Sequence, residues 1–167
     1  MSWNGGTVMK WTQQQLFKIM NFPHHFQTGF DFSNRLTDEF EILAISQAMV
    51  HGTIERIDFD KYELSMQVNV TITVECALTL LPTDYLMEFS CSDYYSFVPD
   101  ESDDTVVLEK NTLDLEEITW GSILLEKPLR VVRDDAYEIL ESRGIVLEES
   151  VIDTEEEPKS PFINKKK

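Results

Sequence analysis

Cysteine and glycine are both scarce in this sequence, and each shortage excludes a class of site. The 167 residues include two cysteines, Cys76 and Cys91, which is too few for a disulfide framework. The six glycines are not spaced as a phosphate-binding loop, and neither a G-x-S-x-G nor an H-E-x-x-H sequence occurs. We therefore expect no nucleotide-binding loop, serine-hydrolase elbow or zincin-type metal site.

Long apolar runs are also missing. No stretch approaches the ~20 apolar residues that a membrane-spanning helix needs. Residues 1–8 have neither the basic region nor the apolar core of a secretory signal. We therefore expect a cytoplasmic protein that does not associate with membranes.

Basic residues are few compared with acidic ones. The chain has 14 Lys+Arg and 31 Asp+Glu, for a net charge of −17, and residues 98–157 alone hold 19 acidic and 5 basic side chains. Nucleic-acid affinity comes largely from basic side chains that displace counterions, so extensive contact with bare RNA or DNA is disfavoured. The natural partner of such a surface is a basic molecule. The alternative is that the charge only keeps the protein soluble.

Alternating apolar and polar residues predict the main strands. Even positions from Tyr62 to Leu80 are apolar and odd positions are polar apart from Ala77, which is typical of an antiparallel strand with one buried face. Residues 48–55 and 84–92 alternate in the same way, and Asp58–Lys61 is predicted to be a hairpin turn. Pro82-Thr83-Asp84 is predicted to separate the last two runs, and Thr105–Leu108 to form a short edge strand.

Three short helices are predicted beside this sheet. Thr12 caps the first, Asp114 caps a second that Pro128 stops, and Asp134 or Asp135 starts a third that ends before Gly144. The prediction is an α+β fold in which short helices flank an antiparallel sheet. The sequence does not decide whether this sheet closes into a barrel. Residues 1–8 are expected to be an extension, 9–145 a single domain, and 146–167 an acidic then basic flexible tail.

No set of residues predicts catalysis or a cofactor. The histidines and cysteines show no metal-ligand spacing, and His24 and His25 are placed in a loop after Pro23. Cys76 and His51, the one conceivable nucleophile–base pair, occupy opposite phases of their predicted strands. Both cysteines are expected to be buried and unreactive. We therefore predict no metal, no cofactor and no enzymatic activity.

Two charged clusters are candidate binding residues. The acidic one is a solvated loop with four carboxylates: Asp100, Glu101, Asp103 and Asp104. The basic one is the only such cluster in the predicted domain: Lys127, Arg130 and Arg133. Spacing of three residues would place these cations on one side, where they either hold an anion or pair with nearby carboxylates. Trp11 and Trp120 are expected to anchor the core.

Several short motifs in a shared order resemble the YceD-like family, particularly its Gram-positive branch. These are Met9-Lys10-Trp11-Thr12 with Leu16, Asp31-Phe32-Ser33, Val50-His51-Gly52, Cys76-Ala77-Leu78-Thr79-Leu80, Asn111-Thr112-Leu113-Asp114-Leu115 and Ile123-Leu124-Leu125-Glu126-Lys127-Pro128-Leu129. The resemblance implies a role in accumulation of large-subunit ribosomal RNA. Genes of this family often neighbour that of a small, basic, zinc-binding ribosomal protein.

Three departures limit what the resemblance transfers. Thr79 replaces the second cysteine of the family's C-x-R-C motif, so a two-cysteine metal or redox site is not expected here. Leu78 replaces the arginine of that motif, and with it any anion contact. The usual ending of the family is not recognisable in Pro158–Lys167.

Three functional hypotheses follow. The first is a non-enzymatic factor for ribosome biogenesis, which binds a basic ribosomal protein or a large-subunit assembly intermediate through Asp100, Glu101, Asp103 and Asp104. The alternative is direct contact with precursor ribosomal RNA through Lys127, Arg130 and Arg133. A hydrolase or nuclease that processes precursor RNA is the third, and it would need a metal site.

Overall fold

A computed structural model describes residues 9–19, 21–102 and 104–145 of the chain. These residues form two compact units. The first comprises the chain up to Glu75 together with Pro82–Val131, and the second comprises Cys76–Leu81 together with the residues from Val132 onward. The predicted extension, 1–8, and the predicted tail, 146–167, lie outside the described residues.

The first unit is built on a mixed sheet. Its described strands are β2 (His24–Phe30), β3 (Ala44–Ile45), β4 (Ala48–Asp58), β5 (Lys61–Glu75), β6 (Pro82–Ser96) and β7 (Thr105–Val107). They pair in the order β2-β4-β5-β6-β7, with β3 also on β5, and all pairs are antiparallel except β6–β7. A second, two-stranded sheet pairs β1 (Lys10–Thr12) with β8 (Thr112–Asp114).

Short helices complete the unit, and their ends follow the predicted capping residues. Helix α1 (Gln13–Lys18) begins with a capping box in which the Thr12 hydroxyl accepts from the Gln15 N–H. Helix α2 (Leu115–Glu126) begins at Asp114, whose Oδ1 accepts from the N–H groups of Glu116 and Glu117. Single turns of 3₁₀ helix span Ser33–Arg35 and Asp38–Phe40. No helix in the described ranges is long and apolar enough to cross a membrane.

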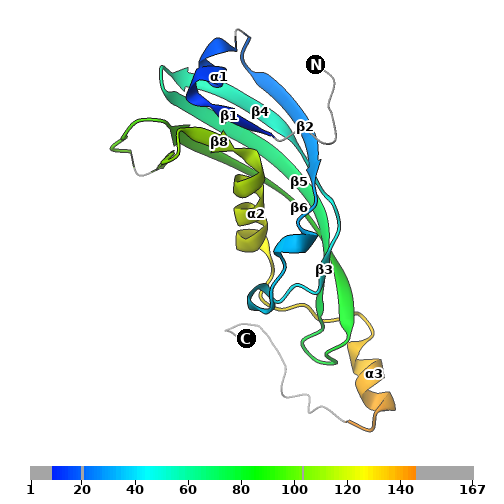
Figure 1. Cartoon of the computed structure of the whole chain (residues 1–167). Coiled ribbons are helices and arrows are strands. Elements are labelled where there is room, and N and C mark those ends of the chain that lie inside the picture. The colour runs from blue at the N-terminus through cyan, green and yellow to red at the C-terminus, as the bar shows by residue number, and fades with distance from the viewer. Residues whose placement is uncertain (1–8, 20, 103, 146–167) are drawn as a thin grey trace, which may run out of the picture. The chain divides into compact units, whose positions relative to one another are not determined.

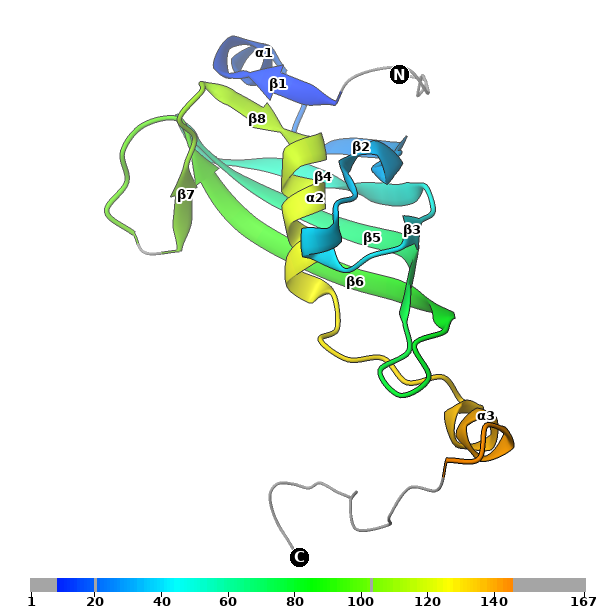
Figure 2. The same ribbon diagram turned by 60° about the horizontal axis from the view of Figure 1, so that its bottom comes forward.

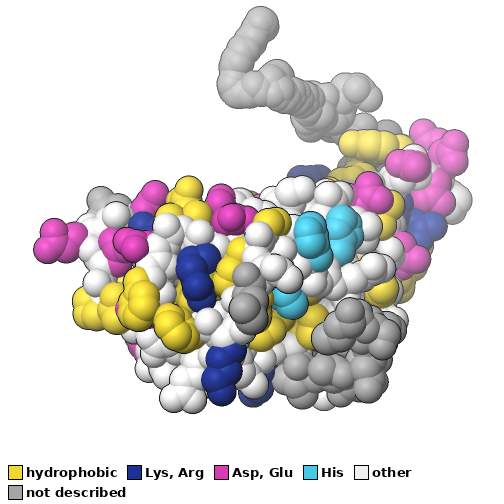
Figure 3. Space-filling model, turned by 90° about the horizontal axis from the view of Figure 1, so that it is seen from above, with side chains coloured by type: hydrophobic (Ala, Val, Ile, Leu, Met, Phe, Trp, Pro, Cys, Tyr) yellow, Lys and Arg dark blue, Asp and Glu magenta, His cyan; other side chains and the backbone are white. Residues whose placement is uncertain are grey.

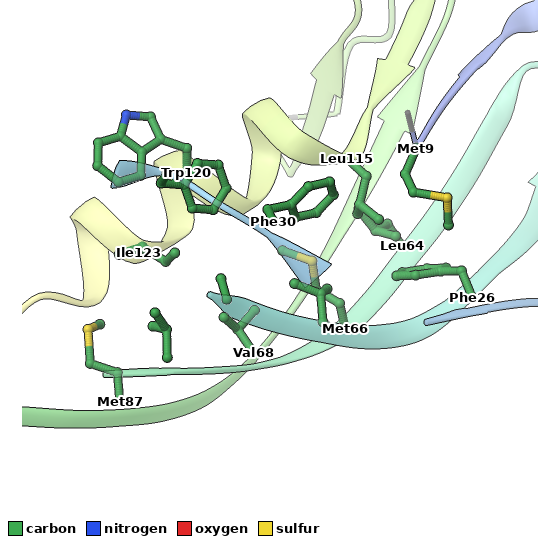
Figure 4. Packing of buried hydrophobic residues seen from close by; sticks show 14 of the residues in the cluster. Met9, Phe26, Phe30, Leu64, Met66, Val68, Met87, Leu115, Trp120 and Ile123 are labelled. Atoms are coloured by element: carbon green, nitrogen blue, oxygen red, sulfur yellow. The ribbon is translucent and has the colours of Figure 1, made fainter. Parts of the chain in front are cut away.

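Helix α2 lies across one face of the long strands, and the core lies between them (Figures 1 and 2). Trp120 and Ile123 of α2 pack over Val68 and Met87 of the sheet (Figure 4). The Trp120 ring also packs against the rings of Phe32 and Phe40, with centroid separations of 5.1 and 5.4 Å. Every even-numbered residue of β5 is buried, as the alternation predicted: Tyr62, Leu64, Met66, Val68, Val70, Ile72 and Val74.

The α+β class is confirmed, but the sheet does not close into a barrel. Within the described residues its edge strands are β2 and β7, which do not pair with each other. The edge position of Thr105–Val107 is confirmed, although this strand runs parallel to β6, so the sheet is not purely antiparallel.

Two local predictions were wrong. His24 and His25 begin strand β2 rather than a loop, because residues 24–30 pair along their whole length with β4. Pro82 begins β6 rather than a turn, because the chain has already reversed at 76–81. There the Leu80 N–H donates to the Cys76 carbonyl and the Cys76 N–H to that of Leu81. Proline at the first residue of a strand loses no ladder hydrogen bond.

The second unit contains that reversal and helix α3 (Ala136–Ser142). Asp135 precedes the helix and Gly144 follows it with a φ of 80°, the left-handed conformation that ends helices. The Arg143 guanidinium donates to the Thr79 carbonyl at 3.2 Å, which joins the end of the helix to the 76–81 turn.

Strands β4 and β5 approach so closely at Gly52 that only glycine fits. A Cβ at this position would overlap the Ser65 carbonyl oxygen and lie 2.7 Å from the Met66 Cα. Both obstacles are backbone atoms of the paired strand, so they cannot rotate away.

We predict that Gly52→Ala lowers the free energy of unfolding by about 3 kcal/mol, since overpacking against backbone forces the strands apart. The matched control is Gly121→Ala in α2, where an added Cβ meets no atom within 4 Å. That change should stabilise the protein by about 0.5–1 kcal/mol through helix propensity. Urea unfolding followed by circular dichroism measures both, and equal effects would contradict the close approach.

Candidate functional site

The predicted acidic loop follows β6 at one end of the sheet. Asp100 is used within the fold, because its carboxylate lies 3.4 Å from the Lys61 ammonium and accepts from the Ser102 N–H. These contacts hold its pKa below the ordinary value, with the Ser102 hydrogen bond as the main cause. Glu101 and Asp104 are exposed. Asp103 lies outside the described residues, so two of the four carboxylates remain available to a partner on this loop.

The residues of the predicted basic cluster belong to different units. Lys127 and Arg130 belong to the first unit and Arg133 to the second. The Arg133 guanidinium is held by both carboxylate oxygens of Asp135, at 2.9 and 3.2 Å. Side-chain hydrogen bonding to Asp135 raises the Arg133 pKa and lowers that of Asp135. Of the two alternatives for this cluster, holding an anion or pairing with nearby carboxylates, Arg133 follows the second.

Most arginine side chains form ion pairs or hydrogen bonds within the fold. Arg35 pairs with Glu116 and Glu117, and Arg56 donates to the Leu16 carbonyl and the Tyr62 hydroxyl. Arg130 is the exception, since it makes no hydrogen bond or ion pair with another described residue. By contrast, four carboxylates take part in the ion pairs between described residues: Asp100, Glu116, Glu117 and Asp135. The charge left for a partner is therefore mainly negative.

The face of the sheet opposite α2 is a second candidate surface, which sequence reasoning did not identify. Among the described residues of the first unit, no helix lies on it (Figures 1 and 2). The strand register places uncharged polar side chains in rows across it: His25, Thr53, Ser65 and Ser92 in one row, and Gln27, His51, Gln67 and Ser90 in the next. Seen from above, histidine side chains (cyan) lie beside white surface, which is uncharged polar side chains or backbone, and beside hydrophobic side chains (yellow) (Figure 3). We call this surface the open face.

A shallow groove of about 410 Å³ runs over the centre of the open face. Its walls come from β4, β5 and β6: His51, Gly52, Thr53, Ser65, Met66, Gln67, Ser90, Cys91 and Ser92. The hydroxyls of Ser65 and Ser92 hydrogen-bond to each other at 3.1 Å, and the Ser92 hydroxyl also donates to Glu63 at 3.1 Å. The groove therefore presents short hydroxyl side chains, the His51 imidazole and the exposed Gln67 amide, beside the apolar Met66 and the Cys91 thiol.

Carboxylates stand at both ends of this groove. Glu55 and Glu63 are directly opposite each other in the β4–β5 register, one row beyond Thr53 and Ser65. Like charges in this position destabilise a sheet, and neither forms an ion pair with a described residue. At the other end, Glu88 lies opposite Asn69, one row beyond Gln67 and Ser90.

The cysteines do not form a site with the histidines. Cys91 is half-buried, where desolvation raises its pKa, and its thiol lies 3.7 Å from the Ser122 hydroxyl. Cys76 is fully buried, as predicted, and its Sγ accepts from the backbone N–H groups of Leu78, Thr79 and Arg133, each at 3.4 Å. No group of three or more His, Cys, Asp or Glu side chains within the described residues is placed to hold a metal ion.

The chain is similar to a curated bacterial protein. The chain is 27% identical over 135 residues to a Bacillus subtilis (strain 168) protein named "Uncharacterized protein YlbN", and the match covers 78% of this chain and 77% of that one. No protein-family model matches the chain. No solved structure matches it either.

The environment of Cys76 leads to a prediction on stability and pH. Burial raises the pKa of its thiol, but the hydrogen bonds from Arg133, Thr79 and Leu78 lower it further, from 9.0 to about 7. Between pH 7 and 9 the native protein then holds fewer protons than the unfolded chain, so this group makes the free energy of unfolding rise with pH.

We expect Cys76→Ser to remove that rise, whereas Cys91→Ser should keep it. Urea unfolding at pH 6.5, 7.5 and 9 measures the difference. The same pH dependence in the wild type and in Cys76→Ser would contradict a thiolate stabilised in the native turn.

Proposed function

We propose that this protein is a YceD-like, cytoplasmic factor for ribosome biogenesis that supports accumulation of large-subunit ribosomal RNA. It acts without catalysis, by binding a basic ribosomal protein or a large-subunit assembly intermediate through its acidic surface. The carboxylates shield the basic partner until ribosomal RNA replaces them. The resemblance to the family motifs is the basis for proposing ribosome biogenesis, and the charge distribution is the basis for the proposed mechanism.

One observation carries the mechanism: the fold uses its arginines internally and leaves its carboxylates exposed. Of the five arginines, four are engaged by carboxylates, carbonyls or a hydroxyl, namely Arg35, Arg56, Arg133 and Arg143. Glu101 and Asp104 stay exposed on the loop after β6. Such a surface attracts a basic partner over long range and repels phosphates.

Direct contact with precursor ribosomal RNA is the alternative, and it has less support. Asp135 already neutralises Arg133, which leaves Lys127 and Arg130 as the cations of the predicted cluster without an ion pair to a described residue. Two cations bind a phosphate backbone weakly at physiological salt, because each contributes one counterion release.

The test is a pulldown at low salt from lysate with and without RNase, followed by mass spectrometry. The paired change Glu101→Gln and Asp104→Asn should reduce the retained basic ribosomal protein by about tenfold, since rim charges act mainly through long-range attraction. The control is Glu138→Gln with Glu141→Gln, which makes the same change of net charge on exposed residues of α3.

A basic ribosomal protein that survives RNase would support the proposal. Loss of every ribosomal component on RNase treatment would overturn it in favour of RNA contact, with Arg130 as the residue to change next. Equal losses from the acidic-loop variant and its control would show that net charge matters and the loop does not.

A further inference from the structure

We propose that the groove on the open face docks an extended, basic segment of the protein partner. This inference rests on the proposed function and names where the partner binds. The groove is not part of the predicted acidic loop. It lies in the middle of β4, β5 and β6, with the loop beyond one end.

The geometry fits an extended chain. The groove is shallow, and its hydroxyls and the exposed Gln67 amide can hydrogen-bond to a peptide backbone laid over them. Glu63 and Asn69, which flank the groove along β5, are six residues apart, so the carboxylates at the two ends are separated by roughly 20 Å at about 3.3 Å per residue. Two basic residues about six positions apart in an extended segment would reach both ends.

Charge complementarity selects the occupant. Glu55 and Glu63 lie side by side at one end and Glu88 at the other. Like charges directly opposite each other destabilise a sheet, so a lysine or arginine from a partner placed beside Glu55 and Glu63 would offset their repulsion.

The same face is unsuited to nucleic acid. On the described parts of β2, β4, β5 and β6, the one Lys or Arg that the register places on the open face is Lys61, and Asp100 pairs with it. A phosphate chain in the groove would meet carboxylates at both ends without a free cation to hold it.

The experiment uses the full chain, immobilised, and the mixture of proteins stripped from purified large ribosomal subunits, with the stripped ribosomal RNA as a separate probe. Gln67→Arg places a cation in the groove at an exposed position, and Glu55→Gln with Glu63→Gln and Glu88→Gln neutralises both ends. Each should lower the retained basic protein at least tenfold. Circular dichroism and Tm identify any variant that has not folded, and the second variant then decides.

The matched controls are Gln14→Arg, a cation on the exposed surface of α1, and Glu126→Gln with Glu138→Gln and Glu141→Gln, three neutralised carboxylates elsewhere. Both should retain wild-type amounts. If wild-type protein binds a basic ribosomal protein and both groove variants bind it equally well, the partner does not dock in the groove, and the proposed function stands. If the wild type retains no basic protein, or retains only the RNA, the proposed function and the groove both fall.

Discussion

The division of β5 into two faces is the constraint on which the rest of the structure depends. Its buried even-numbered side chains form the floor on which α2 packs, and its odd-numbered side chains form the middle of the open face. A shift of pairing by one residue would exchange the two sets and place Val68 in water and Gln67 under Trp120. The core therefore fixes the register, and the register fixes which side chains meet in the groove.

Gly52 is the second constraint on that register. The backbone of β4 comes so close to Ser65 and Met66 that no larger residue is accommodated, and the groove lies over this point. The position gives a physical reason for the glycine in Val50-His51-Gly52, one of the motifs that carried the resemblance. A packing requirement and a candidate binding surface thus coincide on the same three strands.

Most arginine side chains are engaged in contacts within the fold, whereas several carboxylates remain exposed to solvent. Arg35 and Arg133 form ion pairs and Arg56 donates to a backbone carbonyl, whereas Glu55 and Glu63 are paired in register without an ion pair to a described residue. The acidic loop after β6 was predicted as one group of four carboxylates, but it divides. Asp100 belongs to the fold, through Lys61 and Ser102, while Glu101 and Asp104 face solvent.

The sequence by itself determined the local features: the buried phase of β5, the hairpin at Asp58–Lys61, the caps at Thr12 and Asp114, and Gly144 at the end of α3. These depend on residues a few positions apart, so alternation and capping rules capture them. Only the tertiary structure decided that His24 and His25 start a strand, that β7 runs parallel to β6, and that His51, Gln67 and Ser90 share one groove. These features depend on which distant strands pair and in what register, and that choice is made by burial of the whole core rather than by any one segment.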